Sequence, residues 1–395
     1  MQSSRPPVLV FGSGLTTLGT IRLLASAGLK PFVVSDTPGM VAKSRWYRPA
    51  PRSTSSENPR DNLPAWLDGL PLQRAILLAC SDEWALRVAR CADAFRERFP
   101  TSIASPAVLE TLIDKSRLAT VLTELGLPQP RTTPLDLSTK LADIPDSALA
   151  GVFIKPREST PFFRRFQVKG FHVTSRADLG QRLEELAKLG IAVELQEYIP
   201  GPPTNYFYVE GFIDRSGQMP ALFTRQRLRM DPPDFGNSTL FRSVDPSSVS
   251  AAVETVTRLL RHLKYRGIFS AELKRDERDG VYRLIEVNAR PWWYVEFAGQ
   301  CGINLAAMHA ADALGEPVVP VRTFTVGKAC VYPLYDFHAC TELRAANKLT
   351  MREWAATWLT STQPVARWSD PMPASGMVGI ALRRLAKSLG IAKRR

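Results

Sequence analysis

The chain has 395 residues, 45% of them hydrophobic and 23% charged, which is typical of a globular protein long enough for two or three domains. Its five cysteines form no CxxC pair, which argues against a zinc site and a disulfide framework. The net charge of +13 suggests nucleic acid, but the basic residues are spread along the chain, so we expect no nucleic-acid partner. No apolar run approaches the roughly 18–20 residues of a membrane-spanning helix, and the first residues lack a signal-peptide pattern. We therefore expect a cytoplasmic protein.

The N-terminal region predicts a small parallel α/β domain. PVLVFG (7–12) is a short apolar run that ends in glycine, a helical pattern follows, and PFVVSD (31–36) is a second run. Together they predict a β-α-β unit with a glycine-rich first turn. ILLACSDE (76–83) predicts a further strand, followed by a helix through Phe95.

The middle of the chain predicts an α+β body with a largely antiparallel sheet. Residues 111–126 predict one helix that ends at Gly126 and Pro128. The later strands are expected in GVFIKP (151–156), AVELQEY (192–198), NYFYVEGFID (205–214) and GQMPALFTRQRLRM (217–230), and the later helices over 176–189 and 246–264. Near the C-terminus we expect a strand in VGKACVYPLYDF (326–337) and short helices near 341–359 and 376–390.

The strongest chemical signal is the segment GIFSAELKRDERDGVYRLIEVNAR (267–290). Its alternation of apolar and polar residues predicts strands over 268–275 and 281–288, joined by a loop that contains Asp279 and Gly280. The two strands therefore form an expected hairpin.

Three oxygen-bearing side chains converge on one face of this hairpin. Glu286 and Asn288 share a face because side chains alternate along a strand. A hairpin centred near Arg278 places Glu272 opposite Leu284 and diagonal to Glu286. Carboxylate and amide oxygens suit Mg²⁺ rather than zinc. A solvated polar face is the plain alternative, but it does not explain carboxylates inside apolar runs.

Two lysines and a turn add nucleotide-binding features. Lys115 in LIDKSR and Lys155 in FIKPR lie on separate elements, and Lys155 ends an apolar strand, where a phosphate partner would explain its charge. The segment VELQEYIPG (193–201) predicts a strand that passes into a Pro-Gly hinge. Its backbone can hydrogen-bond an adenine edge, with Glu197 beside it.

Three arginines alternate along one expected strand. Arg225, Arg227 and Arg229 in TRQRLRM share a face, and like charges on one face repel unless anions or acidic side chains lie opposite. A triphosphate and a substrate carboxylate would meet that need. The alternative is an exposed basic strand edge.

Taken in their order along the chain, these motifs resemble the ATP-grasp superfamily. Within that superfamily they are similar to the carboxylate–amine ligase-like group related to D-aspartate ligase. The resemblance rests on DKSRLATVLTELGLPQP, FIKP, LQEYIPG, YRGIFSAELKRDERDGVYRLIEVNAR and DPMP, and it covers roughly residues 5–320. It implies an α/β and α+β fold. The implied parts are a Rossmann-like pre-ATP-grasp domain (1–110), the N-terminal (111–190) and C-terminal (191–320) lobes of an ATP-grasp domain, and a C-terminal extension (321–395).

The resemblance also implies a function. ATP and Mg²⁺, or Mn²⁺ in its place, would serve a ligase that joins a small-molecule carboxylate to an amine through an acyl phosphate. The implied ATP-binding residues are Lys115, Lys155, Gln196, Glu197, Ile199 and Arg225, the metal-binding residues are Glu272, Glu286 and Asn288, and Arg227 and Arg290 steady the transferring phosphoryl group.

The loop after Lys155 departs from the family pattern. RESTPFFRRFQVKG (157–170) has one glycine, Gly170, at its far end, where the family usually has several small ones. We expect it to close as a lid, using Arg164, Arg165 or Lys169, because an acyl phosphate must be kept from water.

Other functions stay open at this point. The sequence FGSGLTTLG with Asp36 resembles a nicotinamide-binding fingerprint, but Gly14 is followed by Gly19, so the spacing misses. A non-catalytic ATP-binding or interaction protein is a second alternative. From residue 383 to 395 there are six basic residues and no acidic one, which fits a solvated tail or contact with a membrane surface. A homodimer is equally open.

Overall fold

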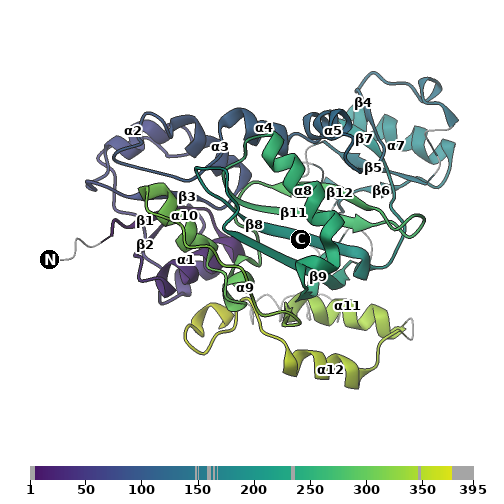
Figure 1. Cartoon of the computed structure of the whole chain (residues 1–395). Helices are drawn as coiled ribbons and strands as arrows, with labels where there is room; N and C mark the ends of the chain where they lie inside the picture. The colour runs from purple at the N-terminus through teal and green to yellow at the C-terminus, as the bar shows by residue number, and fades with distance from the viewer. Residues whose placement is uncertain are drawn as a thin grey trace, which may run out of the picture.

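The structure, a computed structural model, describes residues 5–146, 149, 151–157, 162, 165–166, 168–232, 236–345 and 348–375 (Figure 1). Within these residues the strands form three sheets, of three, six and four strands. The mixture of a parallel α/β part with antiparallel sheets agrees with the expected α/β and α+β class. The domain limits drawn from the sequence stay predictions.

The first sheet is parallel, with the order β2-β1-β3. Its strands are β1 (Val8–Phe11), β2 (Pro31–Val34) and β3 (Ile76–Ala79), and the helices that follow them are α1 (Gly14–Ser26), the 3₁₀ helix η1 (Gly39–Lys43), α2 (Leu63–Asp68) and α3 (Asp82–Cys91). All of β1 is buried, as expected for a central strand covered on both faces. Gly12 leaves β1 at φ +146°, and a Cβ there would lie 2.9 Å from the Cβ of Cys80, so glycine is required. The predicted β-α-β unit is confirmed.

The second sheet is antiparallel, with the order β12-β11-β8-β9-β10-β13. Its strands are β8 (Tyr206–Ile213), β9 (Ala221–Asp231), β10 (Asn237–Ser243), β11 (Gly267–Arg275), β12 (Tyr282–Asn288) and β13 (Ala329–Val331), and the helices beside it are the 3₁₀ helices η4 (Pro203–Asn205) and η5 (Pro246–Val249) with α8 (Ser250–His262), α9 (Val295–Gln300) and α10 (Leu305–Leu314).

Helix α8 covers one face of this sheet (Figure 1). Its buried Val256 and Leu259 belong to the same core cluster as Phe269 and Ala271 of β11. Because side chains alternate, the even-numbered residues of β11 point to the opposite face. That face carries the polar residues of the candidate site.

The third sheet has the order β4-β7-β5-β6 and a small core of its own. Its strands are β4 (Thr132–Leu135), β5 (Val152–Pro156), β6 (Phe171–His172) and β7 (Val193–Glu197), and its helices are the 3₁₀ helix η2 (Leu141–Asp143) and α7 (Arg176–Lys188). Ile154, Leu179 and Leu195 are buried together between the sheet and α7.

The single helix expected over 111–126 is wrong. The chain instead forms α4 (Pro106–Ile113) and α5 (Lys115–Glu124), separated at Asp114. Asp114 has an extended backbone (ψ 111°), and its carboxylate accepts hydrogen bonds from the backbone N–H groups of Ser116 and Arg117. An N-cap inside an apolar pattern therefore restarts the helix and makes Lys115 the first residue of α5.

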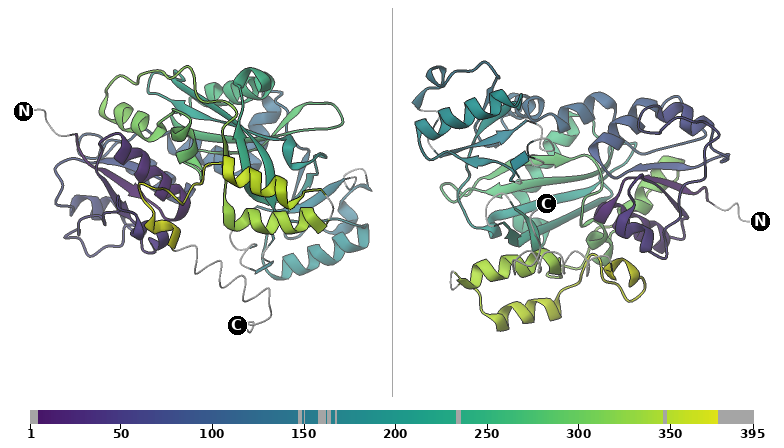
Figure 2. Two further views of the ribbon diagram at one scale, coloured as in Figure 1. Left: turned by 90° about the horizontal axis from the view of Figure 1, so that it is seen from below. Right: turned by 180° about the vertical axis from the view of Figure 1, so that it is seen from behind.

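The C-terminal expectations need two corrections. The strand expected over 326–337 ends at Val331, because Pro333 starts α11 (Pro333–Ala345). The helix expected over 341–359 is the end of α11 followed by α12 (Met351–Thr360), which starts with a capping box made by Thr350 and Glu353. Figure 2 shows α11 and α12 side by side along the six-stranded sheet. The helix expected over 376–390 and the basic tail lie outside the described residues.

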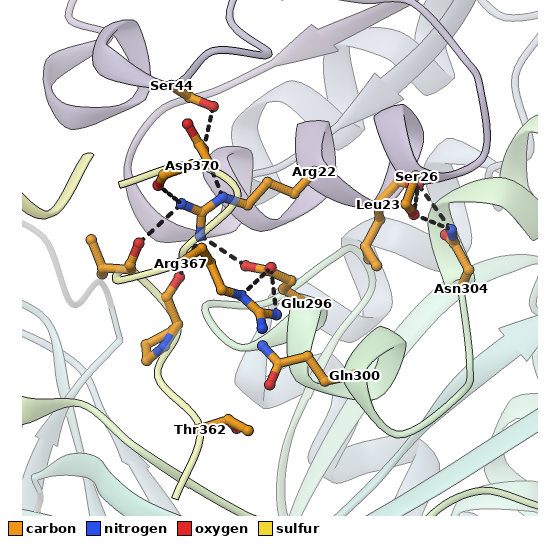
Figure 3. A network of polar contacts seen from close by, with 12 residues as sticks. Arg22, Leu23, Ser26, Ser44, Glu296, Gln300, Asn304, Thr362, Arg367 and Asp370 are labelled. Atoms are coloured by element: carbon orange, nitrogen blue, oxygen red, sulfur yellow. Dashed lines mark hydrogen bonds and ion pairs between the residues drawn. The ribbon is translucent and has the colours of Figure 1, made fainter. Parts of the chain in front are cut away.

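The chain returns from α12 to the first sheet through a buried ionic network (Figure 3). Arg22 of α1 donates Nε to the Oδ2 of Asp370 at 2.9 Å and Nη1 to the Oε2 of Glu296 at 3.1 Å. It also donates to the carbonyl oxygens of Pro364, at 3.0 Å, and Val365, at 2.9 Å. One side chain thus attaches the 362–370 segment to α1.

The five cysteines are free and buried. Among the helices that the structure describes, none is long and apolar enough to cross a membrane.

Candidate active site

A cavity of about 760 Å³ lies between the four-stranded sheet and β12. This volume is in the range of small-molecule sites. Five residues selected from the sequence line it: Lys115, Lys155, Gln196, Glu286 and Asn288. The fold therefore brings together side chains that are up to 173 positions apart, as counted from Lys115 to Asn288.

The two lysines form one wall of this cavity. The Nζ of Lys115 donates to the carbonyl oxygen of Pro156 at 2.9 Å, and the Nζ of Lys155 donates to the Oε1 of Gln196 at 2.9 Å. Burial, with the nearby charge of Lys155, lowers the pKa of Lys115 to about 8. A bound anion would reverse this effect, because it would favour the charged form of Lys115.

Glu194 of β7 also lines the cavity, and the sequence analysis did not select it. Its side chain is fully buried, and within the described structure neither carboxylate oxygen has a hydrogen-bond partner. Its Oε1 lies 3.9 Å from the Nζ of Lys155. Burial raises the pKa of Glu194, while the charges of Lys155 and Lys115 oppose that rise. A charged residue inside the apolar run VELQ was the signal that could have identified it.

Glu272 and Glu286 lie directly opposite each other in the β11–β12 ladder, and Ser270 lies opposite Asn288. The expected register, with Glu272 opposite Leu284, is wrong. The pairing shifts after Glu272, so that Leu273 lies opposite Leu284 and β12 contains one extra residue at this point. The shift brings the two carboxylates closer than the diagonal arrangement would.

Glu286 is ionised in this setting. Burial acts to raise its pKa, but the charges of Lys155 and Lys169 and a hydrogen bond from the Nδ2 of Asn288 at 3.3 Å lower it overall. Two carboxylates and an amide oxygen on one face are a donor set that fits Mg²⁺. Among the described residues, no cluster of three or more His, Cys, Asp or Glu side chains could hold a metal, so the assignment of Glu272, Glu286 and Asn288 stays a prediction.

The three arginines of β9 are buried, so the alternative of an exposed basic edge is wrong. Each one pairs with an acidic side chain: Arg225 with Glu210 at 2.9 Å, Arg227 with Glu272 at 3.0 Å, and Arg229 with Asp336 at 2.7 Å. None of the three arginines lines the cavity, and neither does Glu272, the partner of Arg227.

Three other predicted residues lie at the margin of the cavity. Arg290 forms two hydrogen bonds with the carboxylate of Asp82, at 2.8 and 3.0 Å, and Asp82 lines the cavity. Glu197 accepts from the Nη2 of Arg278 at 2.6 Å, and Ile199 is buried. The side chains of Glu197 and Ile199 do not line the cavity, and the role of this segment as a hinge stays a prediction.

One of the expected lid residues, Lys169, lies where the charges of Glu272 and Glu286 act on it. The Nζ of Lys169 donates to the Oδ1 of Asn237 at 2.7 Å. Burial lowers the pKa of Lys169, and the charges of Glu272 and Glu286 partly offset this. Arg165 lies over the ring of Phe166, and Arg164 lies outside the described residues.

Comparison with known proteins gives one relative by sequence and many by structure. No family model matches the chain. A D-aspartate ligase from Enterococcus faecium (strain Aus0004) is 25% identical over 250 residues, which cover 61% of this chain and 59% of that protein. The match thus spans less than two thirds of that relative.

The solved structures share the fold. An L-amino acid ligase from Bacillus licheniformis has a TM-score of 0.56 and 17% identity, over 82% of this chain and 79% of that chain. An N5-carboxyaminoimidazole synthase from Aspergillus clavatus, in complex with ADP, has a TM-score of 0.61 and 14% identity over 82% and 81%. A biotin carboxylase from Campylobacter jejuni has a TM-score of 0.60 and 16% identity over 83% and 75%. The resemblance of this chain to the ATP-grasp carboxylate–amine ligases, which its motifs predicted, is confirmed by these relatives.

Proposed function

We propose that this chain is an ATP-dependent ligase that joins a carboxylate to an amine through an acyl phosphate and releases ADP and phosphate. One observation carries the proposal: two lysines face an ionised glutamate and an asparagine across a single cavity of about 760 Å³. That arrangement offers cations to phosphate groups on one side and oxygen ligands to a divalent cation on the other.

Lys115 and Lys155 would neutralise the phosphates of ATP. Lys155 already donates a hydrogen bond across the cavity wall to Gln196, so its ammonium group is held in place before ATP arrives. Because burial lowers the pKa of Lys115, an anionic partner would strongly stabilise the charged form of this lysine.

Glu286, Asn288 and Glu272 would hold Mg²⁺, or Mn²⁺ in its place. When bound, such an ion would supply positive charge that neutralises the charge developing during phosphoryl transfer. Glu272 shares its charge with Arg227 at 3.0 Å, which leaves Glu286 as the carboxylate most available to the ion.

The reaction needs no nucleophile from the protein. A carboxylate oxygen of the substrate attacks the γ-phosphorus, and ADP leaves with the electron pair of the broken P–O bond. The amine nitrogen then attacks the acyl carbon, and phosphate leaves. Arg227 and Arg290 would stabilise the transferring phosphoryl group. Arg227 would replace part of its hydrogen bonding to Glu272, and Arg290 part of its hydrogen bonding to Asp82, by hydrogen bonds to phosphoryl oxygens.

An ADP-release screen tests the proposal. Purified protein with ATP and Mg²⁺ is given D- and L-amino acids, dipeptides and amino sugars, singly and in pairs. ADP that appears only with a particular carboxylate–amine pair, together with the amide, supports the ligase. ATP binding without ADP release in any pair would favour the non-catalytic alternative, and binding of NADH in place of ATP would favour the oxidoreductase.

A further inference from the structure

Helix α11 carries a histidine that is oriented by a carboxylate. The Nδ1 of His338 lies 2.6 Å from the Oδ1 of Asp231 at the end of β9. The His338 side chain is 60% exposed, whereas that of Asp231 is 10% exposed. Within the described part of the chain, the Nε2 of His338 makes no hydrogen bond. An imidazole held by a half-buried carboxylate through one nitrogen, with the other nitrogen open, is the arrangement of a general base.

This pair lies at the end of the polar sheet face that carries the candidate site. Asp231 is the last residue of β9, the strand that also carries Arg227 and Arg229. Its cross-strand neighbour is Asn237, whose Oδ1 accepts a hydrogen bond from Lys169 at 2.7 Å.

Lys169 connects this end of the sheet to the carboxylates, since the charges of Glu272 and Glu286 act on its ammonium group. The Cα atoms of Arg227 and Asp231 are roughly 13 Å apart along the strand.

The contact between His338 and Asp231 is not needed to hold α11 in place. Asp336 of the same helix is fully buried and accepts both Nε and Nη2 of Arg229, at 2.9 and 2.7 Å. The indole N–H groups of Trp354 and Trp358 also donate to Asp336, each at 3.0 Å. An exposed ion pair adds little to such an anchor.

The proposed ligase reaction, on which this inference rests, needs a proton acceptor. An amine reaches the enzyme as its ammonium ion near neutral pH, and that form has no lone pair with which to attack a carbonyl carbon. Arg227, Arg290 and the lysines of the cavity carry positive charge and are assigned above to the phosphate groups. The charged group in contact with His338 is Asp231, while Arg229 and Asp336 pair with each other and Lys169 is held by Asn237.

We propose that His338 is the base that takes the proton from the amine substrate, with Asp231 as its positioning residue. The proton moves from the ammonium nitrogen to the Nε2 of His338, and the freed lone pair forms the C–N bond to the acyl carbon. The bond from that carbon to the phosphate oxygen breaks, phosphate leaves with the electron pair and takes the second proton from the nitrogen, and the imidazolium returns its proton to water. The acceptor subsite therefore takes a primary amine, and the C-terminal region supplies one of its walls.

Hydroxylamine separates this role from a structural one. It is neutral near neutral pH and attacks acyl phosphates without a base, so it reports the first half of the reaction. The variants are His338→Gln and Asp231→Asn, with His262→Gln, an exposed histidine at the end of α8, as the matched control. The substrates are the carboxylate–amine pair that releases most ADP in the screen, and the same carboxylate with hydroxylamine.

We expect His338→Gln to lower amide formation by about 100-fold or more, while hydroxamate formation stays within about threefold of the wild type. The loss should shrink as the pH rises, because the amine then loses its proton unaided, and a purely structural contact would show no such recovery. Amide formation at the wild-type rate, or an equal loss of amide and hydroxamate, overturns the inference. If the wild-type protein yields neither hydroxamate nor ADP with any carboxylate, the proposed function fails first and this role falls with it.

Discussion

Glu272 and Glu286 face each other across the β11–β12 ladder, and each is matched by a different cation. Arg227 of β9 lies 3.0 Å from Glu272, while the charges of Lys155 and Lys169 act on Glu286. Two carboxylates side by side repel, so this arrangement depends on the cations around it. Glu286 is therefore the carboxylate at which a divalent cation would contribute the most favourable electrostatic interaction.

Replacing Glu286 by Gln should therefore weaken the metal dependence of ATP binding. The variant keeps the shape of the side chain and removes its charge, so we expect the Mg²⁺ concentration for half-maximal ATP binding to rise by about tenfold or more. A Mg²⁺ titration followed by the fluorescence of an ATP analogue measures this. Glu277→Gln, in the exposed loop of the same hairpin, is the control and should behave as the wild type. Equal behaviour of the two variants would show that Glu286 is no ligand.

The affinity for ATP should fall as the pH rises through about 8. Lys115 has its pKa lowered to about 8 by burial, so in the free protein it loses its charge in that range. ATP favours the charged form, and binding above this pH must therefore be accompanied by proton uptake. Calorimetry in buffers of different ionisation enthalpy measures the uptake, and it should vanish in Lys115→Met but persist in the control Lys188→Met, at the exposed end of α7. Undiminished uptake in Lys115→Met would assign the proton to another group.

The same lowered pKa has the opposite effect on folding. Between about pH 8 and the ordinary pKa of lysine, the unfolded chain binds the proton that the folded chain has lost, so the contribution of Lys115 to stability rises with pH. Denaturant unfolding at several pH values measures this effect. The free energy of unfolding of Lys115→Met should exceed that of the wild type by the largest amount below this pH range. A difference that does not change with pH would contradict the assignment.

Asp336 should be the residue on which the C-terminal helices depend most. It is fully buried and pairs with Arg229, so Asp336→Ala leaves a buried guanidinium without its partner and should lower the free energy of unfolding by about 3–5 kcal/mol. Urea unfolding measures the change. Asp93→Ala, which breaks the exposed pair with Arg96, should cost less than about 1 kcal/mol. Similar costs for both variants would mean that α11 is held mainly by apolar contacts.

Arg22 should control the attachment of the segment that follows α12. Its guanidinium binds the carboxylates of Glu296 and Asp370 and three backbone carbonyls of that segment (Figure 3). In Arg22→Met, we expect the backbone amides of residues 362–370 to exchange hydrogen faster than in the wild type, with smaller changes elsewhere. Hydrogen exchange followed by mass spectrometry tests this. Arg87→Met, on the exposed face of α3, is the control, and an unchanged rate over 362–370 in Arg22→Met would contradict the role of the network.

The sequence could predict the helices and strands better than the positions where they begin, end or change register. The hairpin strands and the β-α-β unit follow from apolar periodicity, which depends only on neighbouring residues. The break at Asp114 depends on a side chain that caps rather than continues a helix, and the shifted register after Glu272 depends on one extra residue in β12. Neither the helix break nor the shifted register changes the apolar pattern, so the pattern alone could not predict them.

Most of the charged residues that line the cavity could be predicted from the sequence, but the ion pairs of the residues beside it could not. A charge inside an apolar strand pointed to Lys155 and Glu286, and the same criterion would have pointed to Glu194. The partners of the β9 arginines lie 15, 45 and 107 residues away, and no local pattern predicts such pairings. The contact of His338 with Asp231 could not be predicted for the same reason, because the two residues are 107 positions apart in the sequence.

The most direct test of the proposed function follows the oxygen atoms of the carboxylate substrate. The wild-type protein is given ATP, Mg²⁺, the amine and a carboxylate labelled with heavy oxygen, and the released phosphate is examined by mass spectrometry. An acyl phosphate intermediate predicts one labelled oxygen in the phosphate for each amide formed, because the C–O bond breaks on attack by the amine. Unlabelled phosphate alongside amide formation would contradict this mechanism, and ADP release without any amide would contradict the ligase itself.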